Sequence, residues 1–326
     1  MGGVPGPSSP PGQVSSQAPW EATTYSAAGE TTGSVTMAVV GDELVREFDE
    51  NGFVVVPDLL SSDELTRYQA AVRAAVASRK AHDDRALADR SVYEQSFVQC
   101  QNLWEDFPEV RPLTFHPRLA QAAAELIGAP AVRLFHDQAL FKEPGGRETD
   151  PHQDLPYWPI SEPDTLTAWV PFDGSTLRSG CMGYVPGSHR LGLRKFINIF
   201  RDGADEIRAQ AQELMVVEPV YVEVPRGSVA FHHGLTAHLA RPNESDATRE
   251  VHTVIYFRDG CTRSPEGSHP SLDRAGIAVG APIASDVTPV AWPRDPGDLP
   301  QPPPAPKGVP EVLRRLGILP GGTTAD

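Results

Sequence analysis

The segment TDPHQDLPYWPI, residues 149–160, places a histidine and a carboxylate two positions apart in a polar, proline-rich stretch. In an extended chain, side chains two positions apart point to the same face, so His152 and Asp154 can converge on one point. A neutral imidazole and a carboxylate on one face can share a metal ion. The same spacing is common by chance in a polar turn, so the pair indicates a metal site only if the chain supplies a third ligand.

A candidate third ligand lies in the segment VPRGSVAFHHGLTAHLARPNESDATREVHTVIYF, residues 224–257. His238 follows Asp154 by 84 positions, and Arg249 follows His238 by eleven, at the start of an expected strand. Two histidines and one carboxylate form the facial triad of non-haem Fe(II) oxygenases, which leaves coordination positions open for a keto acid and dioxygen. A guanidinium on a neighbouring strand suits the far carboxylate of 2-oxoglutarate, because its planar fork matches a carboxylate bidentately.

The elements that must position these residues change in type along the chain. Residues 41–78 predict a helix, a short strand and a second helix, with Gly52 ending the first helix and Ser61 or Ser62 capping the second. A further helix is expected at 116–128, and the polar segment 79–112 between them is expected to be a mobile flap. Short turn-bounded strands are expected at 131–143, 165–173, 181–186, 218–224, 228–232 and 250–258.

Helices followed by many short strands predict a mostly β protein, a sandwich or jelly roll with helices packed outside it. An insert at 200–215 is expected to form either a lid over the mouth of the jelly roll or a simple surface helix. No internal repeat is visible, which excludes solenoids and propellers.

Composition divides the chain into three parts. Residues 1–37 are dominated by small residues and proline and predict a disordered leader, whereas the folded body is expected over 38–260. Residues 261–326 are rich in proline and glycine, and we expect a tail that lies on the surface or extends from it, with a short helix at 311–319.

Charge and targeting signals narrow the partners. The formal net charge of −15 argues against nucleic acid, which needs a basic footprint. Three cysteines lie far apart and predict buried free thiols rather than a zinc ribbon or a disulfide framework. The sequence shows neither a signal peptide nor an apolar run of membrane-spanning length, so we expect a cytoplasmic protein without a membrane partner. The oligomeric state stays open.

The order of these blocks resembles the phytanoyl-CoA dioxygenase (PhyH) family of Fe(II)- and 2-oxoglutarate-dependent oxygenases. The resemblance is carried by ENGFVVVPDLLSSDEL, DQALFKEPGG, PHQDLPYW, LTAWVPFD, GCMGYVPGSHR and GSVAFHHGLTAHLARPNESDATR, which together span roughly 210 residues. It implies a double-stranded β-helix, a cupin-like jelly roll, that takes Fe(II), with 2-oxoglutarate and O2 as cosubstrates.

By the same resemblance, His152, Asp154 and His238 are the iron ligands, and Arg249 binds the C5 carboxylate of 2-oxoglutarate. Three more residues match positions that line the cosubstrate or substrate pocket: Gln138, Lys142 and Trp169. From the sequence alone, Trp169 could equally be a core aromatic and Lys142 a solvated strand end.

The remaining histidines and aromatics leave alternatives open. His232 and His233 lie just before the predicted bend and could bind metal, but the position of His238 favours His238 as the ligand; the family resemblance makes His232 a non-ligand. His189 is expected to be a turn residue, and His136 and His252 are expected to face either a pocket or the core. Tyr157 and Trp158 follow the ligand pair and predict an aromatic substrate wall, with simple packing as the alternative.

These residues predict a hydroxylase that oxidises an unactivated C–H bond of a small molecule, with a natural-product intermediate as the favoured substrate. Related halogenases replace the metal-binding carboxylate with a small residue; the retained Asp154 favours hydroxylation over halogenation, and desaturation, epoxidation or cyclisation stay open. An acyl-CoA hydroxylase is the alternative within the family, although no strongly basic cluster for a CoA diphosphate is visible. A non-catalytic jelly-roll binding module and a cupin-like enzyme with another metal are the alternatives outside it.

Overall fold

The computed structural model describes residues 37–81, 83, 85–194 and 213–304. The leader expected at 1–37, apart from Met37, most of the insert expected at 200–215 and the short helix expected at 311–319 lie outside these residues. The described helices and strands all belong to one compact unit, which begins at Ala38.

The N-terminal part of this unit forms a helix, a strand and a helix, as the sequence predicts. Helix α1 (Asp42–Asn51) ends at Gly52, whose φ of 82° lies in the left-handed region that favours glycine. Strand β1 (Phe53–Val56) follows, and Ser61 then caps α2 (Ser62–Arg79) through a capping box with Glu64. Short elements and α5 complete this half of the chain: 3-10 helix η1 (Leu87–Asp89), β2 (Val98–Gln101), α3 (Leu103–Asp106), α4 (Arg111–Thr114) and α5 (Pro117–Leu126).

The segment expected to be a mobile flap is instead partly built into the fold. Strand β2 pairs with β3 from Val98 to Gln101, and α3 and α4 follow it directly. Leu103 and Trp104 are fully buried in the main hydrophobic core. The expectation of a flap is therefore wrong for residues 98–112, because their scattered apolar residues find partners on a sheet built from distant segments.

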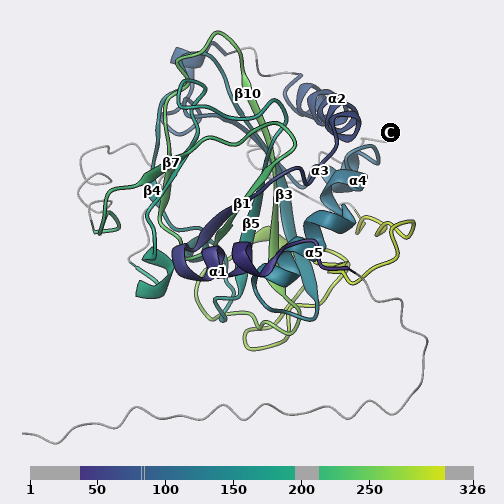
Figure 1. Cartoon of the computed structure of the whole chain (residues 1–326). Helices are drawn as coiled ribbons and strands as arrows, with labels where there is room; N and C mark the ends of the chain where they lie inside the picture. The colour runs from purple at the N-terminus through teal and green to yellow at the C-terminus, as the bar shows by residue number, and fades with distance from the viewer. Residues whose placement is uncertain (1–36, 82, 84, 195–212, 305–326) are drawn as a thin grey trace, which may run out of the picture. The chain divides into compact units, whose positions relative to one another are not determined.

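The seven-stranded major sheet is antiparallel, with the order β1-β8-β5-β10-β3-β11 and with β2 also pairing with β3. Besides β1, four of its strands agree with expectation: β3 (Val132–Lys142), β5 (Thr165–Pro171), β8 (Val229–His233) and β10 (Arg249–Arg258). Helices cover its outer face (Figure 1), where α2 and α5 contribute to the main core together with residues such as Val254 and Tyr256 of β10.

The minor sheet has four strands in the order β4-β9-β6-β7, and it carries two of the residues singled out in the sequence. Strands β6 (Met182–Tyr184) and β7 (Val220–Val222) were expected, whereas β4 (Thr149–His152) and β9 (His238–Ala240) were not. The 3-10 helices η2 (Leu155–Tyr157) and η3 (Ser188–Leu191) follow β4 and β6.

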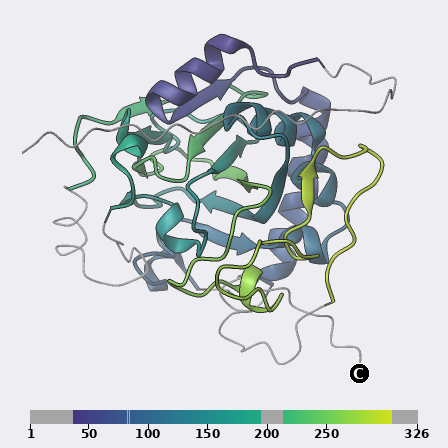
Figure 2. The same ribbon diagram turned by 90° about the horizontal axis from the view of Figure 1, so that it is seen from below.

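The C-terminal segment up to residue 304 belongs to the same unit rather than standing apart from it. It contains α7 (Pro270–Asp273) and β11 (Val290–Trp292), which pairs with the start of β3. Cys261, Leu272 and Ile283 are fully buried against Phe135 and Phe257. Figure 2 shows this green-to-yellow segment running past the strands that it covers.

Two antiparallel sheets of this order form the jelly roll, the double-stranded β-helix fold predicted from the sequence. Two apolar clusters fill its interior: Phe53, Trp169 and Tyr184 belong to one, and Phe135, Trp158 and Leu272 to the other. All three cysteines are buried and free. Within the described ranges, no helix is long and apolar enough to span a membrane.

Candidate active site

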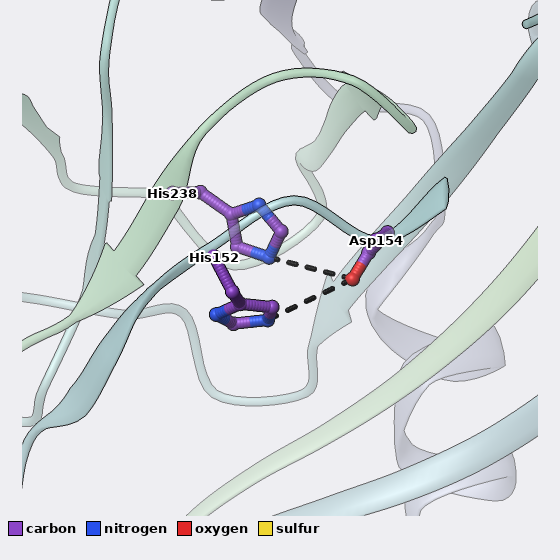
Figure 3. A group of neighbouring side chains, drawn as sticks. All are labelled: His152, Asp154 and His238. Carbon is purple, nitrogen blue, oxygen red and sulfur yellow. Dashed lines mark ion pairs between the residues drawn. The ribbon is translucent and has the colours of Figure 1, made fainter. Parts of the chain in front are cut away.

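The three residues of the expected metal site converge in the structure. His152 ends β4 and His238 begins β9, and the two are direct partners in the antiparallel pair. Asp154 follows at the start of η2, with its Oδ1 lying 3.7 Å from His152 Nε2 and 3.6 Å from His238 Nε2. Figure 3 shows both imidazoles pointing toward this carboxylate. One ligand atom from each residue lies within 4.8 Å of the others, which is the spacing that a shared metal ion requires.

Backbone carbonyls orient both imidazole rings. His152 Nδ1 lies 2.8 Å from the Asp150 carbonyl, and His238 Nδ1 lies 2.9 Å from the Thr236 carbonyl. Because a carbonyl only accepts, each Nδ1 must carry the proton and donate, which leaves the Nε2 lone pair free to bind a metal. Burial lowers the pKa of both rings to about 4, so both are neutral near pH 7.

The two oxygens of Asp154 have different partners. The Thr167 hydroxyl donates to Oδ2 at 2.9 Å, and His232 Nε2 lies 3.2 Å from the same oxygen. Oδ1 is thereby left facing His152 and His238. Burial alone would raise the pKa of Asp154, but the imidazoles of His238 and His232 hold it below its usual range. Two neutral imidazoles and one carboxylate fit a divalent iron ion.

A close approach of two backbone segments fixes Asp154. Its N–H and that of Leu155 both donate to the Gly234 carbonyl, at 3.0 and 2.8 Å. A Cβ at Gly234 would lie 2.1 Å from Thr165 Oγ1 and 3.3 Å from the Trp158 ring. Only glycine therefore lets the end of β8 pass close enough to hold the carboxylate.

The triad opens into a cavity of about 1080 Å³ between the two sheets. Along the strands of the major sheet, side chains that line the cavity alternate with side chains on the other face. The lining side chains are Gln138 and Leu140 from β3, Thr167 and Trp169 from β5, Arg249 and Thr253 from β10, and His232 from β8. The aromatic residues that follow the ligand pair, and residues of the loop before β2, also line it.

Arg249 is a buried charge with an unfilled hydrogen-bonding capacity. Its side chain lines the cavity and lies over the Trp169 ring, with the guanidinium carbon 5.2 Å from the ring centroid. One Nη donates to the Gly180 carbonyl, Nε has no partner, and no carboxylate in the described ranges pairs with the guanidinium. Burial lowers the pKa of Arg249 to about 10, so it stays charged at neutral pH. A buried, unpaired cation of this kind calls for an anion.

The three other pocket residues expected from the sequence lie in different environments. Trp169 and Gln138 line the cavity, and Gln138 Oε1 accepts a hydrogen bond from Gln99 at 2.6 Å. Lys142 is not among the lining residues. It is fully buried next to Arg249, its strand partner, and its amino group donates to the Arg147 carbonyl. Burial lowers the pKa of Lys142 to about 6. Its contacts thus lie beside the cavity wall rather than in it, and a role for Lys142 in cosubstrate or substrate binding stays a prediction.

The structure also places the residues whose roles were open. Tyr157 lines the cavity with its ring centroid 6.1 Å from that of His152, and Trp158 lines it while packing against Phe135. His136 faces the cavity, whereas His252 points to the opposite face of the sheet, near Asp137. The cavity residues that the sequence did not single out include Thr167, Tyr93, Gln99 and His269. Thr167 could have been predicted, because the period of two along the strand expected at 165–173 puts it on the same face as Trp169.

The curated relatives resemble this chain over part of their length. The phytanoyl-CoA dioxygenase domain-containing protein 1 of Mus musculus is 29% identical over 153 residues, which is 45% of this chain and 52% of the relative. The matched region thus spans about half of this relative.

Solved structures match more of the chain. The non-heme alpha-ketoglutarate-dependent carbocyclase SnoK from nogalamycin biosynthesis is 31% identical, with a TM-score of 0.64 over 79% of this chain and 99% of SnoK. The epimerase SnoN, solved with Fe3+, alpha-ketoglutarate and nogalamycin RO, is 27% identical, with a TM-score of 0.63 over 77% of this chain and 98% of SnoN.

The part of the chain that matches a known family contains the elements that build the site. Residues 48–251 match the phytanoyl-CoA dioxygenase (PhyH) family, and this range contains all three residues of the triad together with Arg249. With the jelly roll and the triad in place, the chain belongs to the phytanoyl-CoA dioxygenase family.

Proposed function

We propose that this protein is an Fe(II)- and 2-oxoglutarate-dependent dioxygenase that hydroxylates an unactivated C–H bond of a small organic molecule. The observation that carries the proposal is the combination, in one cavity, of the His152–Asp154–His238 triad with the unpaired guanidinium of Arg249. A binding module without catalysis has no need of both a metal donor set and a buried cation.

Each group has a distinct task. The triad holds the iron, with Thr167 and His232 turning one oxygen of Asp154 toward the two imidazoles. Arg249 binds the far carboxylate of 2-oxoglutarate, and Trp169 supports its guanidinium from one face. Iron bound with the keto acid supplies the activation of dioxygen that the protein side chains cannot. The cavity walls position the substrate and exclude water.

The substrate that we favour is a natural-product intermediate. SnoK and SnoN, both from nogalamycin biosynthesis, match 79% and 77% of this chain. The retained carboxylate of Asp154 favours hydroxylation, although the named activities of these two neighbours, carbocyclisation and epimerisation, are reactions of the same iron and keto-acid chemistry. An acyl-CoA substrate is disfavoured, because Arg249 is the one Lys or Arg among the described lining residues.

The test is to add Fe(II) and then 2-oxoglutarate to the anaerobic protein and to record the weak visible charge-transfer band. Wild type should develop the band and release succinate in air. Asp154→Ala should lose both, and undiminished succinate formation in that variant would contradict the assigned triad. A protein that binds metal but gives no band with 2-oxoglutarate would favour the cupin-like alternative.

A pair of arginines at the two ends of β10 provides the matched control. Arg249→Met should weaken 2-oxoglutarate binding by about tenfold or more while leaving Fe(II) binding intact, because it removes a charge-assisted bidentate contact. Arg258→Met, at the other end of the strand and paired with Asp164 at 2.8 Å, should leave both unchanged. Equal effects of the two substitutions would contradict the role of Arg249.

A further inference from the structure

The cavity continues well beyond the proposed metal and cosubstrate sites. On the paired strands β3 and β10, Arg249 faces Lys142 at one end, and His136 faces Ile255 near the other. His136 lies six positions before Lys142 on β3, which corresponds to roughly 20 Å. His136 and several residues between Ser264 and Asp273, His269 among them, line the far end. Nothing in the proposed chemistry at the triad uses this end.

A β-bulge gives His136 its position. The register between β3 and β10 shifts so that Leu134 pairs with Tyr256 and His136 with Ile255, which leaves Phe135 as an extra residue on β3. A bulge of this kind re-aims neighbouring side chains, and bulges are frequent beside functional sites. The rings of Phe135 and His136 lie with centroids 5.3 Å apart, and both contact the ring of His269, which lines the cavity.

His136 is buried without a hydrogen-bond partner among the described residues. Its side chain is 2% exposed, Nδ1 has no hydrogen-bond partner, and no group in the described part of the chain bonds to Nε2. A buried polar group of this kind costs free energy unless a ligand or water satisfies it. A neutral imidazole offers one donor and one acceptor. Burial keeps His136 neutral by lowering its pKa to about 4.

His269 comes from the C-terminal segment and stacks on His136. The two ring centroids lie 5.3 Å apart with an interplanar angle of 19°. His269 Nδ1 accepts the N–H of Ser271 at 3.2 Å, so this neutral ring carries its proton on Nε2, where no described group accepts it. Buried Glu105 fixes the segment by pairing with both terminal nitrogens of Arg274, one of them at 2.8 Å.

The surroundings of the two imidazoles are aromatic and carry no unpaired positive charge within the described residues. Trp158 lies edge-on to His136 at 6.3 Å, and Phe135 lies 4.5 Å from His269, both measured between centroids. Among the lining residues of this end, Asp273 is paired with Arg263, and Glu266 adds a second acidic group. These described residues offer no cation to bind a phosphate or a carboxylate, whereas their aromatic side chains can pack against a flat ring.

We propose that this end of the cavity is a substrate subsite for an uncharged, planar unsaturated ring that carries a hydroxyl or carbonyl oxygen. His136 and His269 hydrogen-bond that oxygen, and the walls formed with Trp158 pack against the ring. The subsite rests on the proposed function, because it would hold the part of the substrate that is remote from the oxidised carbon. His136 and His269 would then determine specificity without taking part in the chemistry.

The test uses matched probes on the metal-free, full-length protein. 2-Naphthol has a flat ring and a hydroxyl, decahydro-2-naphthol has the same carbon framework without the flat ring, and naphthalene lacks the oxygen. Titration calorimetry should show 2-naphthol binding at least about tenfold more tightly than either relative, the factor expected for one satisfied buried hydrogen bond or one aromatic wall.

Variants then locate the binding. His136→Phe keeps the aromatic wall but removes both nitrogens, and His269→Asn keeps an acceptor for the Ser271 N–H while removing the ring. Each substitution should weaken the binding of 2-naphthol by about tenfold. His136→Phe should change the binding of naphthalene little. His189→Asn, a histidine outside the cavity lining, should bind as wild type does. Thermal melts identify any variant that fails to fold, and the wild-type comparison of probes stands without the variants.

Two results would overturn the subsite: equal affinity of wild type for 2-naphthol and decahydro-2-naphthol, or unchanged 2-naphthol affinity in both histidine variants. The band with Fe(II) and 2-oxoglutarate, measured on the same protein, separates this failure from failure of the proposed function. Band formation without ring preference rejects the subsite alone. Ring preference without the band rejects the dioxygenase alone.

Discussion

At the scale of single residues, the metal site depends on groups that do not bind metal. The Nδ1 atoms of His152 and His238 are held by carbonyls, and Oδ2 of Asp154 is held by Thr167 and His232. These contacts leave three donor atoms facing one point before any ion arrives. Preorganisation of this kind lowers the cost of assembling the site and is typical of groups around metal ligands.

Thr167 provides a direct test of this arrangement. Thr167→Val keeps the shape of the side chain but removes the hydroxyl that donates to Asp154 Oδ2 at 2.9 Å. We expect Fe(II) affinity to fall by about 10- to 100-fold, as is common when a group that orients a ligand is lost. Anaerobic Fe(II) titration measures the change.

The same strand offers the control for that measurement. Thr165 lies two residues before Thr167, and its hydroxyl lies 3.4 Å from the Pro163 carbonyl rather than near Asp154. Thr165→Val should therefore leave Fe(II) affinity at the wild-type level. If the two valine variants lose affinity equally, the hydroxyl of Thr167 has no orienting role.

At the scale of elements, Asp137 joins the outer face of the major sheet to two short helices. It lies on β3 and is fully buried, and its Oδ2 accepts the Trp104 N–H of α3 at 3.1 Å and the Thr114 hydroxyl of α4 at 2.7 Å. Burial raises the pKa of Asp137 to about 7, although these hydrogen bonds oppose the shift. The link between sheet and helices therefore contains a carboxyl that is protonated below neutral pH.

This pKa makes stability depend on pH. The folded pKa of Asp137 lies above its unfolded value of 3.8, so between pH 4 and 7 the folded state binds more protons than the unfolded state. Asp137 should therefore contribute a fall in the free energy of unfolding as pH rises through this window, by up to about 1.4 kcal/mol per pH unit. The buried histidines whose pKa is lowered, such as His136, His152 and His238, contribute a rise over part of the same window, so the effect of Asp137 is the difference between wild type and a variant. Asp137→Asn should remove this contribution, so that its free energy of unfolding changes with pH more positively than that of wild type, and urea denaturation at several pH values measures both slopes. Asp259→Asn, at an exposed position, should keep the wild-type slope, and an unchanged slope in Asp137→Asn would contradict the assignment.

The sequence predicts long elements well and short ones poorly. Helix α2 and strands β3, β5 and β10 have strong periodicity, clear caps or β-branched runs, and they lie where expected. Strands β4 and β9 have four and three residues, too few to show a period, and they exist because they pair with each other. The triad was nevertheless found, because ligand type and spacing do not require the strands to be recognised.

Side-chain environments that depend on tertiary contacts cannot be predicted from the sequence pattern. Lys142 has the same parity on β3 as Gln138 and Leu140, yet the loop after the strand removes it from the cavity. The proline and glycine content of 261–304 suggested a surface tail, but composition does not reveal that Leu272 and Ile283 fill the end of the jelly roll. Composition likewise does not reveal that His269, in the same segment, lines the cavity.

At the scale of the whole folding unit, the C-terminal segment completes both the core and the cavity. It covers Phe135 and Phe257, adds β11 to the edge of β3 and brings His269 to the cavity. Loss of three fully buried side chains of this kind costs roughly 6 kcal/mol in burial alone, which is comparable to the whole stability of many domains.

A chain that ends at residue 260 should therefore lack a cooperative unfolding transition, whereas the full chain should show one. Far-UV circular dichroism during urea denaturation makes the comparison. The single substitution Ile283→Ala tests the same contact more gently and should lower the free energy of unfolding by about 2–5 kcal/mol. A truncated chain that unfolds at the wild-type urea concentration would show that this segment is dispensable.

The pairing of His152 with His238 also sets an order of events during synthesis. When the ribosome has added Asp154, two of the three donors exist, but the third is made 84 residues later, and β10 with Arg249 later still. In the finished sheet, β10 lies between β5 and β3, which are both synthesised before it. We therefore expect iron to be acquired after translation of this region rather than during it.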